Sequence, residues 1–319
     1  MANVTELPLD DAAVADIKDY RSNSLWRLTV RRLFRQRSAV VGLVILAILL
    51  FAAIFAPVIA PYEPDQVLIG VENVKKRQAP CIHLLGCPTD QPQHLMGIDG
   101  NVRDLFSRVV YGTRVSLRVG VVTVGFAIIV GTMIGAAAGF LGGTFDNVIM
   151  RLMDVVLAFP FLLLAIAIVS VLGPGLTNAM MAIAIVSIPQ YARVVRASVL
   201  SLREMDYVEA SRALGASQRS ILFTRVLPNA LPPLIVVGTL GIATAILDTA
   251  ALSFIGLGAQ PPTSEWGFML ASERNQVFSA PYLVFFPGLA IMITVLAFNL
   301  LGDGLRDALD PRLAGNFRR

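Results

Sequence analysis

Charged residues are scarce in this chain of 319 residues: Asp, Glu, Lys and Arg make up 15% of it, whereas hydrophobic residues make up 55%. A soluble domain is about a quarter charged, so this chain has too few solvating side chains for one. Its apolar residues also fall in long blocks instead of at the spacings of a soluble core. These features exclude a soluble enzyme, a disordered chain and a nucleic-acid-binding module. They predict an all-α, polytopic membrane protein.

Histidine and cysteine are scarcer still, with two of each. All four lie between Cys81 and His94, so no histidine remains for a metal centre or a proton relay inside the bilayer. The net charge of +4 is modest, and in a membrane protein an excess of Lys and Arg sets the topology. No partner nucleic acid is therefore expected.

Six segments are long and apolar enough to cross a hydrocarbon core, which takes about 20 residues. They are residues 39–60, about 119–141, about 148–172, about 176–191, 230 to about 256, and 281–301. Prolines interrupt several of them, including Pro160, Pro189 and Pro287, and each is expected to bend its helix. The predicted fold is a bundle of six transmembrane helices.

The distribution of Lys and Arg predicts that both termini are cytoplasmic. The N-terminal tail has seven, the segment 192–226 has six and the C-terminal tail has four. The loop 61–118 also has seven, but the charge rule weakens in a loop of this length. The predicted organisation is a cytoplasmic tail 1–38 with an amphipathic interfacial helix over 25–37, a first span 39–60, an extracytoplasmic loop 61–118, a five-helix core 119–301 with a cytoplasmic loop 192–226, and a cytoplasmic tail 302–319.

Small residues recur every fourth position in the second expected span. Such a ridge lets another helix approach closely, so its predicted role is helix packing, not direct contact with a transported molecule. The ridge consists of Gly131, Gly135, Gly139 and Gly143.

The loop 192–226 carries the most informative pattern. Asp206 with Glu209 three positions later marks a helix N-terminus, where Glu209 is expected to cap, and Gly215 is suited to the left-handed end of a helix. A helix this short is marginal in water by itself, yet it has apolar positions such as Val208 and Leu214. These must be covered, either by the ends of its own spans or by another protein.

At this point the sequence resembles a known family. Glu209-Ala210-Ser211, followed by Gly215 and then Leu227-Pro228, is similar to the EAA motif of ABC importer permeases. The resemblance implies a coupling helix that sits in a groove of an ATPase subunit. Two positions depart from the motif: Ser211 replaces its second alanine, and Arg225 replaces its isoleucine.

Three further stretches resemble the C-type subunit of the peptide/nickel permease subfamily. They are residues 94–117, 252–267 and 302–312. Asn101-Val102 and an insert that contains both cysteines depart from the subfamily pattern. The resemblance spans residues 25–312 and implies the type I ABC importer permease fold.

The resemblance also implies the role and the partners. The chain would be one of two homologous permease subunits in the bacterial inner membrane, importing dipeptides or oligopeptides with an extracytoplasmic binding protein and two ATPase subunits. ATP and Mg²⁺ would be bound by those ATPases, since this chain has no G-x-x-x-x-G-K-[ST] phosphate loop. The chain itself is expected to be no enzyme and to hold no cofactor or metal. Nickel, glutathione or an opine are alternative substrates within this class.

Asp248 is the one acid placed beyond the first turns of any expected span. Gly241, Thr244 and Asp248 share a helical face, so they could line a pathway and meet the ammonium group of a peptide. The alternative is a hydrated helix end or an interhelical hydrogen bond. An ion-driven secondary transporter, the main rival class, would need more buried charges than this, and a membrane enzyme would need intramembrane catalytic groups.

The two cysteines allow three interpretations. Cys81 and Cys87 lie in the expected extracytoplasmic loop, where a disulfide persists. Separate thiols, or a metal site with His83 and His94, are the alternatives, although the metal-ligand spacing is loose.

Overall fold

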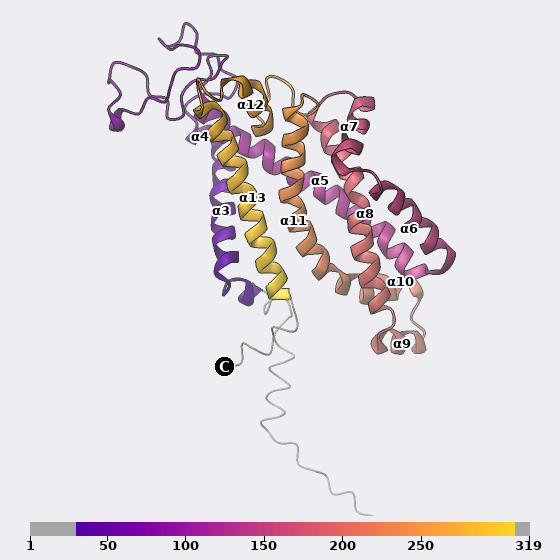
Figure 1. Cartoon of the computed structure of the whole chain (residues 1–319). Coiled ribbons are helices and arrows are strands. Elements are labelled where there is room, and N and C mark those ends of the chain that lie inside the picture. The colour runs from indigo at the N-terminus through magenta and orange to yellow at the C-terminus, as the bar shows by residue number, and fades with distance from the viewer. Residues whose placement is uncertain (1–29, 310–319) are drawn as a thin grey trace, which may run out of the picture.

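The computed structural model describes residues 30–309 (Figure 1). Within them, five helices are long and apolar enough to cross a membrane unaided. They are α3 (Arg37–Ile54), α5 (Leu105–Leu141), α8 (Leu176–Leu202), α11 (Leu227–Phe254) and α13 (Tyr282–Leu309). The short helix α10 (Gln218–Ile221) and a π-helical turn extend α11 back to Gln218. The all-α prediction is confirmed for this part of the chain.

The third expected span, about 148–172, is broken. It consists of α6 (Gly143–Leu157) and α7 (Phe161–Leu172), which meet at an angle of 89°. Pro160 lies in the break and has no backbone N–H to continue a helix across it. Residues 148–172 are thus one bent unit instead of one straight span, because the proline bends this segment far more than the others.

Three helices are longer than the hydropathy alone predicts. α5 begins at Leu105, where the Asp104 carboxylate accepts a hydrogen bond from the Ser107 N–H, so residues 105–118 belong to the same helix as the expected span. α8 continues beyond Tyr191 to Leu202, and α13 continues to Leu309. In α8 this extension buries Val195 and Val199 completely.

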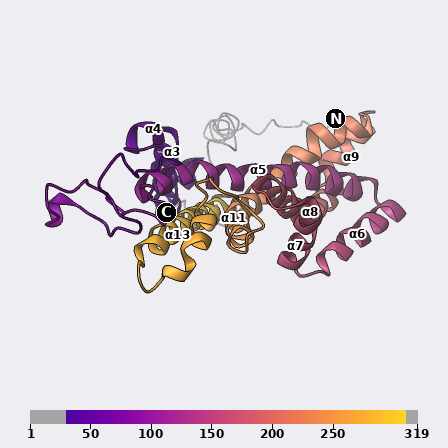
Figure 2. The ribbon, with the colours of Figure 1, turned by 90° about the horizontal axis from the view of Figure 1, so that it is seen from above.

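The core lies where α5 crosses α8 and α11. A continuous cluster of buried aliphatic residues joins these helices to α7, and a second cluster joins α12 (Trp266–Glu273) to α13 and the start of α5. α3 packs beside α13, and Gly42 allows this close approach, because a Cβ there would lie 2.8 Å from the Ala297 carbonyl oxygen. Seen from above, the loop 61–104 and α6 lie at opposite ends of an elongated molecule (Figure 2).

The short elements occupy the two ends of the bundle. α4 (Ala56–Ile59), α12 and the loop 61–104 lie at one end, whereas α9 (Asp206–Ala213) and α10 (Gln218–Ile221) lie at the other (Figure 1). α3 begins and α13 ends at the α9 end (Figure 1). The amphipathic helix expected over 25–37 lies partly outside the described residues; residues 30–33 are helical, and residues 34–36 break the chain direction before α3.

Candidate functional site

α9 is a single eight-residue helix that begins at Asp206. Its N-cap is Met205, and no side chain makes a capping hydrogen bond there, so the expectation that Glu209 caps its own helix is wrong. Asp206 and Glu209 instead contribute two negative charges to the first turn, where they interact favourably with the helix dipole. The Glu209 carboxylate therefore stays available to a partner.

The end of α9 follows from Gly215. This glycine has a φ of +80°, a backbone conformation that residues with a Cβ rarely adopt. The Gly215 N–H donates to the Arg212 carbonyl at 2.9 Å, and the Ala216 N–H donates to the Ser211 carbonyl at 3.1 Å. This is the Schellman arrangement, which closes a helix and turns the chain sharply.

After the sharp turn at Gly215, the helical turns from Gln218 to α11 are unbroken. The Ser217 hydroxyl accepts a hydrogen bond from the Ser220 N–H and caps α10. A π-helical turn, Leu222–Val226, follows directly, and α11 then begins at Leu227 with Pro228 in its first turn, a position where proline is tolerated. A displacement of α9 is therefore passed to α11 through helical backbone.

Most of α9 is not covered by its own chain. Val208 is fully buried against the bundle, but Leu214 is 88% exposed and Phe223, from the following turn, is 63% exposed. Glu209 and Ala210 are also exposed. The bundle thus covers one apolar position of α9, and the others form an open surface that combines apolar side chains with a carboxylate. The half-buried Ser211 donates its hydroxyl to the Tyr207 carbonyl at 2.7 Å.

The glycine ridge of α5 packs against α8. A Cβ at Gly131 would lie 2.8 Å from the Cβ of Tyr191, and one at Gly135 would meet the carbonyl oxygen of Ala192. Gly139 has a similar neighbour, the Arg196 carbonyl at 3.0 Å. Gly143 does not belong to this ridge: it starts α6 with a φ of +61°, and nothing lies within 4 Å of its Cβ position. The four-residue period continues in the sequence, but α5 ends before it reaches Gly143.

Three arginines near the C-terminal end of α8 bind neighbouring helices. Arg196 forms a bidentate pair with Asp146 of α6, with N–O distances of 2.5 and 2.6 Å, and Arg193 contacts Asp154 at 2.8 Å. Arg203 donates to the Gly139 carbonyl of α5 at 2.8 Å. Sequence reasoning does not find these contacts, because their partners lie far apart in the chain. The basic residues of the segment 192–226 were explained by topology alone, which left no reason to look for partners.

Comparisons with known proteins agree with this geometry. The family model for the inner membrane component of binding-protein-dependent transport systems matches residues 131–315, and the model for the N-terminal transmembrane domain of oligopeptide transport permease C matches residues 24–80. The chain belongs to this permease family.

Individual relatives cover nearly the whole chain. The dipeptide transport system permease protein DppC of Alkalihalophilus pseudofirmus is 46% identical over 92% of both chains, and the di/tripeptide permease DppC of Pseudomonas aeruginosa is 48% identical over 87% of this chain and 89% of its own. The glutathione permease GsiD of Pectobacterium atrosepticum is 41% identical over 95% of this chain and 96% of its own. The inward-facing MetNI methionine ABC transporter shares the fold, with a TM-score of 0.53 and 21% identity, over 64% of this chain and 97% of that one.

The expected pathway stripe of the permease is only partly open. Gly241 is half-buried, and the Tyr191 hydroxyl occupies the space that a Cβ there would fill. Thr244 is exposed and donates its hydroxyl to the Gly241 carbonyl at 2.9 Å. Asp248 is half-buried one turn further along α11. The three residues stay predicted lining residues.

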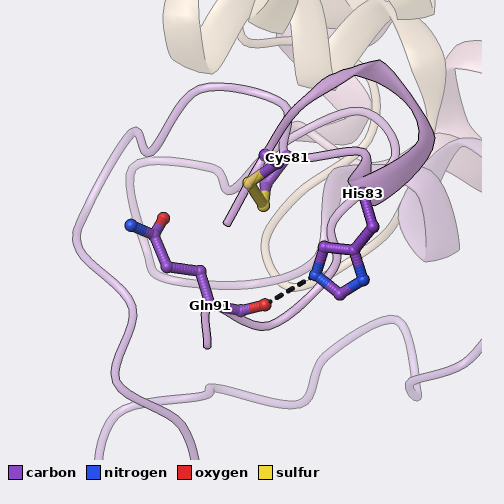
Figure 3. The surroundings of a disulfide bond; sticks show 4 residues. Cys81, His83 and Gln91 are labelled. Carbon is purple, nitrogen blue, oxygen red and sulfur yellow. Dashed lines mark hydrogen bonds between the residues drawn. A yellow bond between two sulfur atoms is a disulfide. The ribbon is translucent and has the colours of Figure 1, made fainter. Parts of the chain in front are cut away.

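The disulfide lies in the loop between α4 and α5 of the permease. Cys81 and Cys87 are bonded and close a short loop around the 3₁₀ turn His83–Leu85 (Figure 3). The backbone of Cys81 exchanges two hydrogen bonds with that of His94, at 2.9 and 3.0 Å, and His83 Nε2 lies 2.9 Å from the Gln91 carbonyl. The cysteines are therefore neither separate thiols nor ligands.

His94 is the buried centre of this loop. Its Nδ1 lies 2.8 Å from an Asp104 oxygen and its Nε2 lies 3.1 Å from a Glu72 oxygen, while the Tyr62 hydroxyl donates to Glu72. Burial opposes a charge here, but the hydrogen bond to Asp104 and the charges of Asp104 and Glu72 outweigh it and raise the pKa of His94 above 6.5. Since Asp104 also caps α5, this cluster attaches the loop to the first turn of a spanning helix.

We expect the loop 61–104 to open more readily as the pH rises. A folded-state pKa above the unfolded value means that His94 stabilises the loop fully below pH 6.5 and loses that contribution as the pH rises through its folded pKa. Amide hydrogen exchange of the loop between pH 6 and 9, corrected for intrinsic rates, measures this. His94→Gln should remove the dependence and His83→Gln should retain it. Equal protection of the wild-type loop across this range would contradict the prediction.

Proposed function

We propose that this permease subunit imports short peptides, driven by ATP that partner ATPase subunits hydrolyse, and that α9 is the element these ATPases contact. The exposed surface of α9 carries this proposal: Glu209, Leu214 and Phe223 are uncovered outside the spanning bundle. Apolar side chains beside an unpaired carboxylate are typical of a surface that another protein covers.

The substrate class rests on the relatives. Relatives named for dipeptide or di/tripeptide transport reach 46–48% identity, and a glutathione permease, whose substrate is itself a small peptide, reaches 41%. Short peptides with free termini therefore fit better than nickel or an opine. Specificity within this class would depend largely on an extracytoplasmic binding protein.

The mechanism follows from the connections of α9. Closure of the ATPase dimer on ATP and Mg²⁺, both held by those partners, would displace α9. α8 precedes α9 closely in the chain, and the turns from Ser217 to Val226 connect α9 to α11. α8 and α11 would therefore tilt together and open a cavity between this chain and a second, homologous permease. α3 begins and α13 ends at the α9 end, which supports the proposal that both termini are cytoplasmic (Figure 1).

Purification of a tagged chain from its native membrane tests the partners. ATPase chains, a second permease and a binding protein should be recovered with it. In proteoliposomes the recovered complex should take up a dipeptide only with ATP inside. Uptake driven by an ion gradient without ATP would contradict the proposal and favour the secondary-transporter class.

Asp248 provides a test of the pathway. If its carboxylate meets the ammonium group of the peptide, Asp248→Asn should lower the uptake of a free dipeptide about tenfold, which corresponds to about 1.4 kcal/mol, and should leave an N-acetylated dipeptide unaffected. The measurement is the ratio of the two uptake rates. Thr244→Ser, one turn away, keeps the hydroxyl and should not change it. An unchanged ratio in Asp248→Asn would reject the role.

A further inference from the structure

A cavity of about 370 Å³ opens at the end of the permease that carries α12. It lies between the C-terminal end of α11, the turn that follows it, and α12 with the residues after it. Its volume is at the lower end of the range for small-molecule sites, so it has room for one or two amino-acid residues. Phe254, Ile255 and Phe268 supply apolar walls.

Arg274 gives this cavity a positive charge that its own segment does not neutralise. It is the one basic residue between α11 and α13, and the two acids of that stretch are engaged elsewhere. Glu265 accepts hydrogen bonds from the Gly267 and Phe268 N–H groups as the N-cap of α12. Glu273 binds Arg77 and the Gly100 N–H instead.

Glu273 is held by the loop before α5. One of its oxygens lies 3.0 Å from Arg77 Nε, and the other accepts the Gly100 N–H at 2.8 Å. The carboxylate is 10% exposed and is therefore satisfied by these partners. The neighbouring Arg274 keeps its charge for a ligand that enters from outside.

Contacts with Phe254 fix the orientation of the Arg274 guanidinium. Its central carbon lies 5.9 Å from the centre of the Phe254 ring, and its Nη1 donates to the Phe254 carbonyl at 3.4 Å. Stacking and one long hydrogen bond orient the planar fork, while the other N–H donors of this five-donor group remain for an anion. A planar fork of this kind suits a carboxylate, which it can bind through two parallel hydrogen bonds.

Gln260 adds an acceptor beside this cation. Its amide nitrogen donates to the Gly256 carbonyl at 3.0 Å and to the Gly258 carbonyl at 3.1 Å, which fixes the side chain and leaves its oxygen to accept a hydrogen bond. The cavity thus combines the donor groups of the Arg274 guanidinium, the acceptor oxygen of the Gln260 amide and apolar walls. These match the carboxylate, the backbone N–H and the side chain of a peptide's C-terminal residue.

We propose that this cavity binds the C-terminal residue of the transported peptide, with Arg274 binding the carboxylate, as the peptide enters the permease. The proposal rests on the proposed peptide substrate and adds a specificity site on this chain. It requires no group beyond the side chains that line the cavity.

The test uses the full complex with its binding protein in proteoliposomes. ATP-dependent uptake of a dipeptide is compared with that of the same dipeptide bearing a C-terminal amide. Arg274→Gln should lower the ratio of acid to amide uptake about tenfold, because it removes a charged bidentate partner of the carboxylate alone. The preference of the binding protein itself is the same for both permeases and cancels when the two ratios are compared.

Two further variants keep the outcome decisive. Gln260→Glu places a negative charge beside Arg274 and should lower the same ratio without removing the arginine. Lys76→Gln removes an exposed positive charge at the same end of the molecule, outside the cavity, and should change nothing. Equal loss of acid and amide uptake in Arg274→Gln, or no loss of either, would overturn the carboxylate site. Absence of ATP-dependent uptake by the wild-type complex would overturn the proposed function instead.

Discussion

Gly215→Val is expected to abolish peptide uptake while the permease still assembles in the membrane. The φ of +80° at this position is strained for any residue with a Cβ and most of all for a β-branched one, so valine forces the turn after α9 to rebuild. Nothing lies within 4 Å of the Cβ position, so the substitution does not disturb the packing of the bundle. The direction of α9 should change, and its proposed contact with the ATPases should be lost.

Glu209→Lys tests the same surface through charge alone. Reversal of a charge at a protein contact costs several kcal/mol when its partner is left unpaired, which predicts a fall in uptake of tenfold to about a hundredfold. ATP hydrolysis by the complex should no longer respond to the loaded binding protein.

Matched variants at the opposite end of the molecule serve as controls. Gly70 has a φ of +79° and equally open surroundings, and Glu63 is an exposed acid. Gly70→Val and Glu63→Lys should therefore retain coupled transport. The account of α9 fails if Gly215→Val and Glu209→Lys take up peptide at the wild-type rate, or if the controls lose uptake to the same extent.

Gly135→Leu is expected to destabilise the folded permease strongly. A Cβ at this position would collide with the backbone carbonyl of Ala192, which cannot move aside as a flexible side chain can. Overpacking of this kind usually costs about 1–3 kcal/mol and more where backbone must shift. Since folded proteins are stable by only about 5–15 kcal/mol, the folded yield and the thermal midpoint in detergent should both drop.

Gly125 is the matched position for this test. It lies in the same helix, and nothing is found within 4 Å of its Cβ site. Gly125→Leu should therefore leave the thermal midpoint unchanged or raise it slightly, since glycine inside a helix is disfavoured by about 0.5–1 kcal/mol relative to alanine. A wild-type midpoint in Gly135→Leu would mean that α5 and α8 are not held together by this close contact.

Hydropathy and local motifs predict the spanning helices and α9 well, because each depends on residues close together in the sequence. Gly215, Ser217 and the start of α11 are of this kind: their own backbone preferences place them. The bend at Pro160 could be expected in position but not in size, because a proline removes one hydrogen bond and leaves the angle to the packing of α6 and α7.

Contacts between distant segments could not be predicted in this way. Arg196 and Asp146 are 50 residues apart, and Glu273 and Arg77 are 196 apart, so no periodicity connects them. The contact between Gly241 and Tyr191 could not be predicted for the same reason. Spacing indicates which residues share a helical face, but Tyr191 belongs to another helix. The cavity around Arg274 likewise exists only once the stretches 253–260 and 268–275 lie against each other.

The arginine contacts of α8 determine how this helix deforms. Arg193, Arg196 and Arg203 all lie within its last three turns or just after them, next to the start of α9, whereas Pro189 interrupts the hydrogen-bond ladder before them. These contacts hold the end of α8 to α5 and α6, so this part of the helix is stiff. The position where α8 bends most easily is Pro189, one turn before Arg193. If the proposed partners displace α9, we expect α6 to move together with the end of α8 and α8 to bend at Pro189.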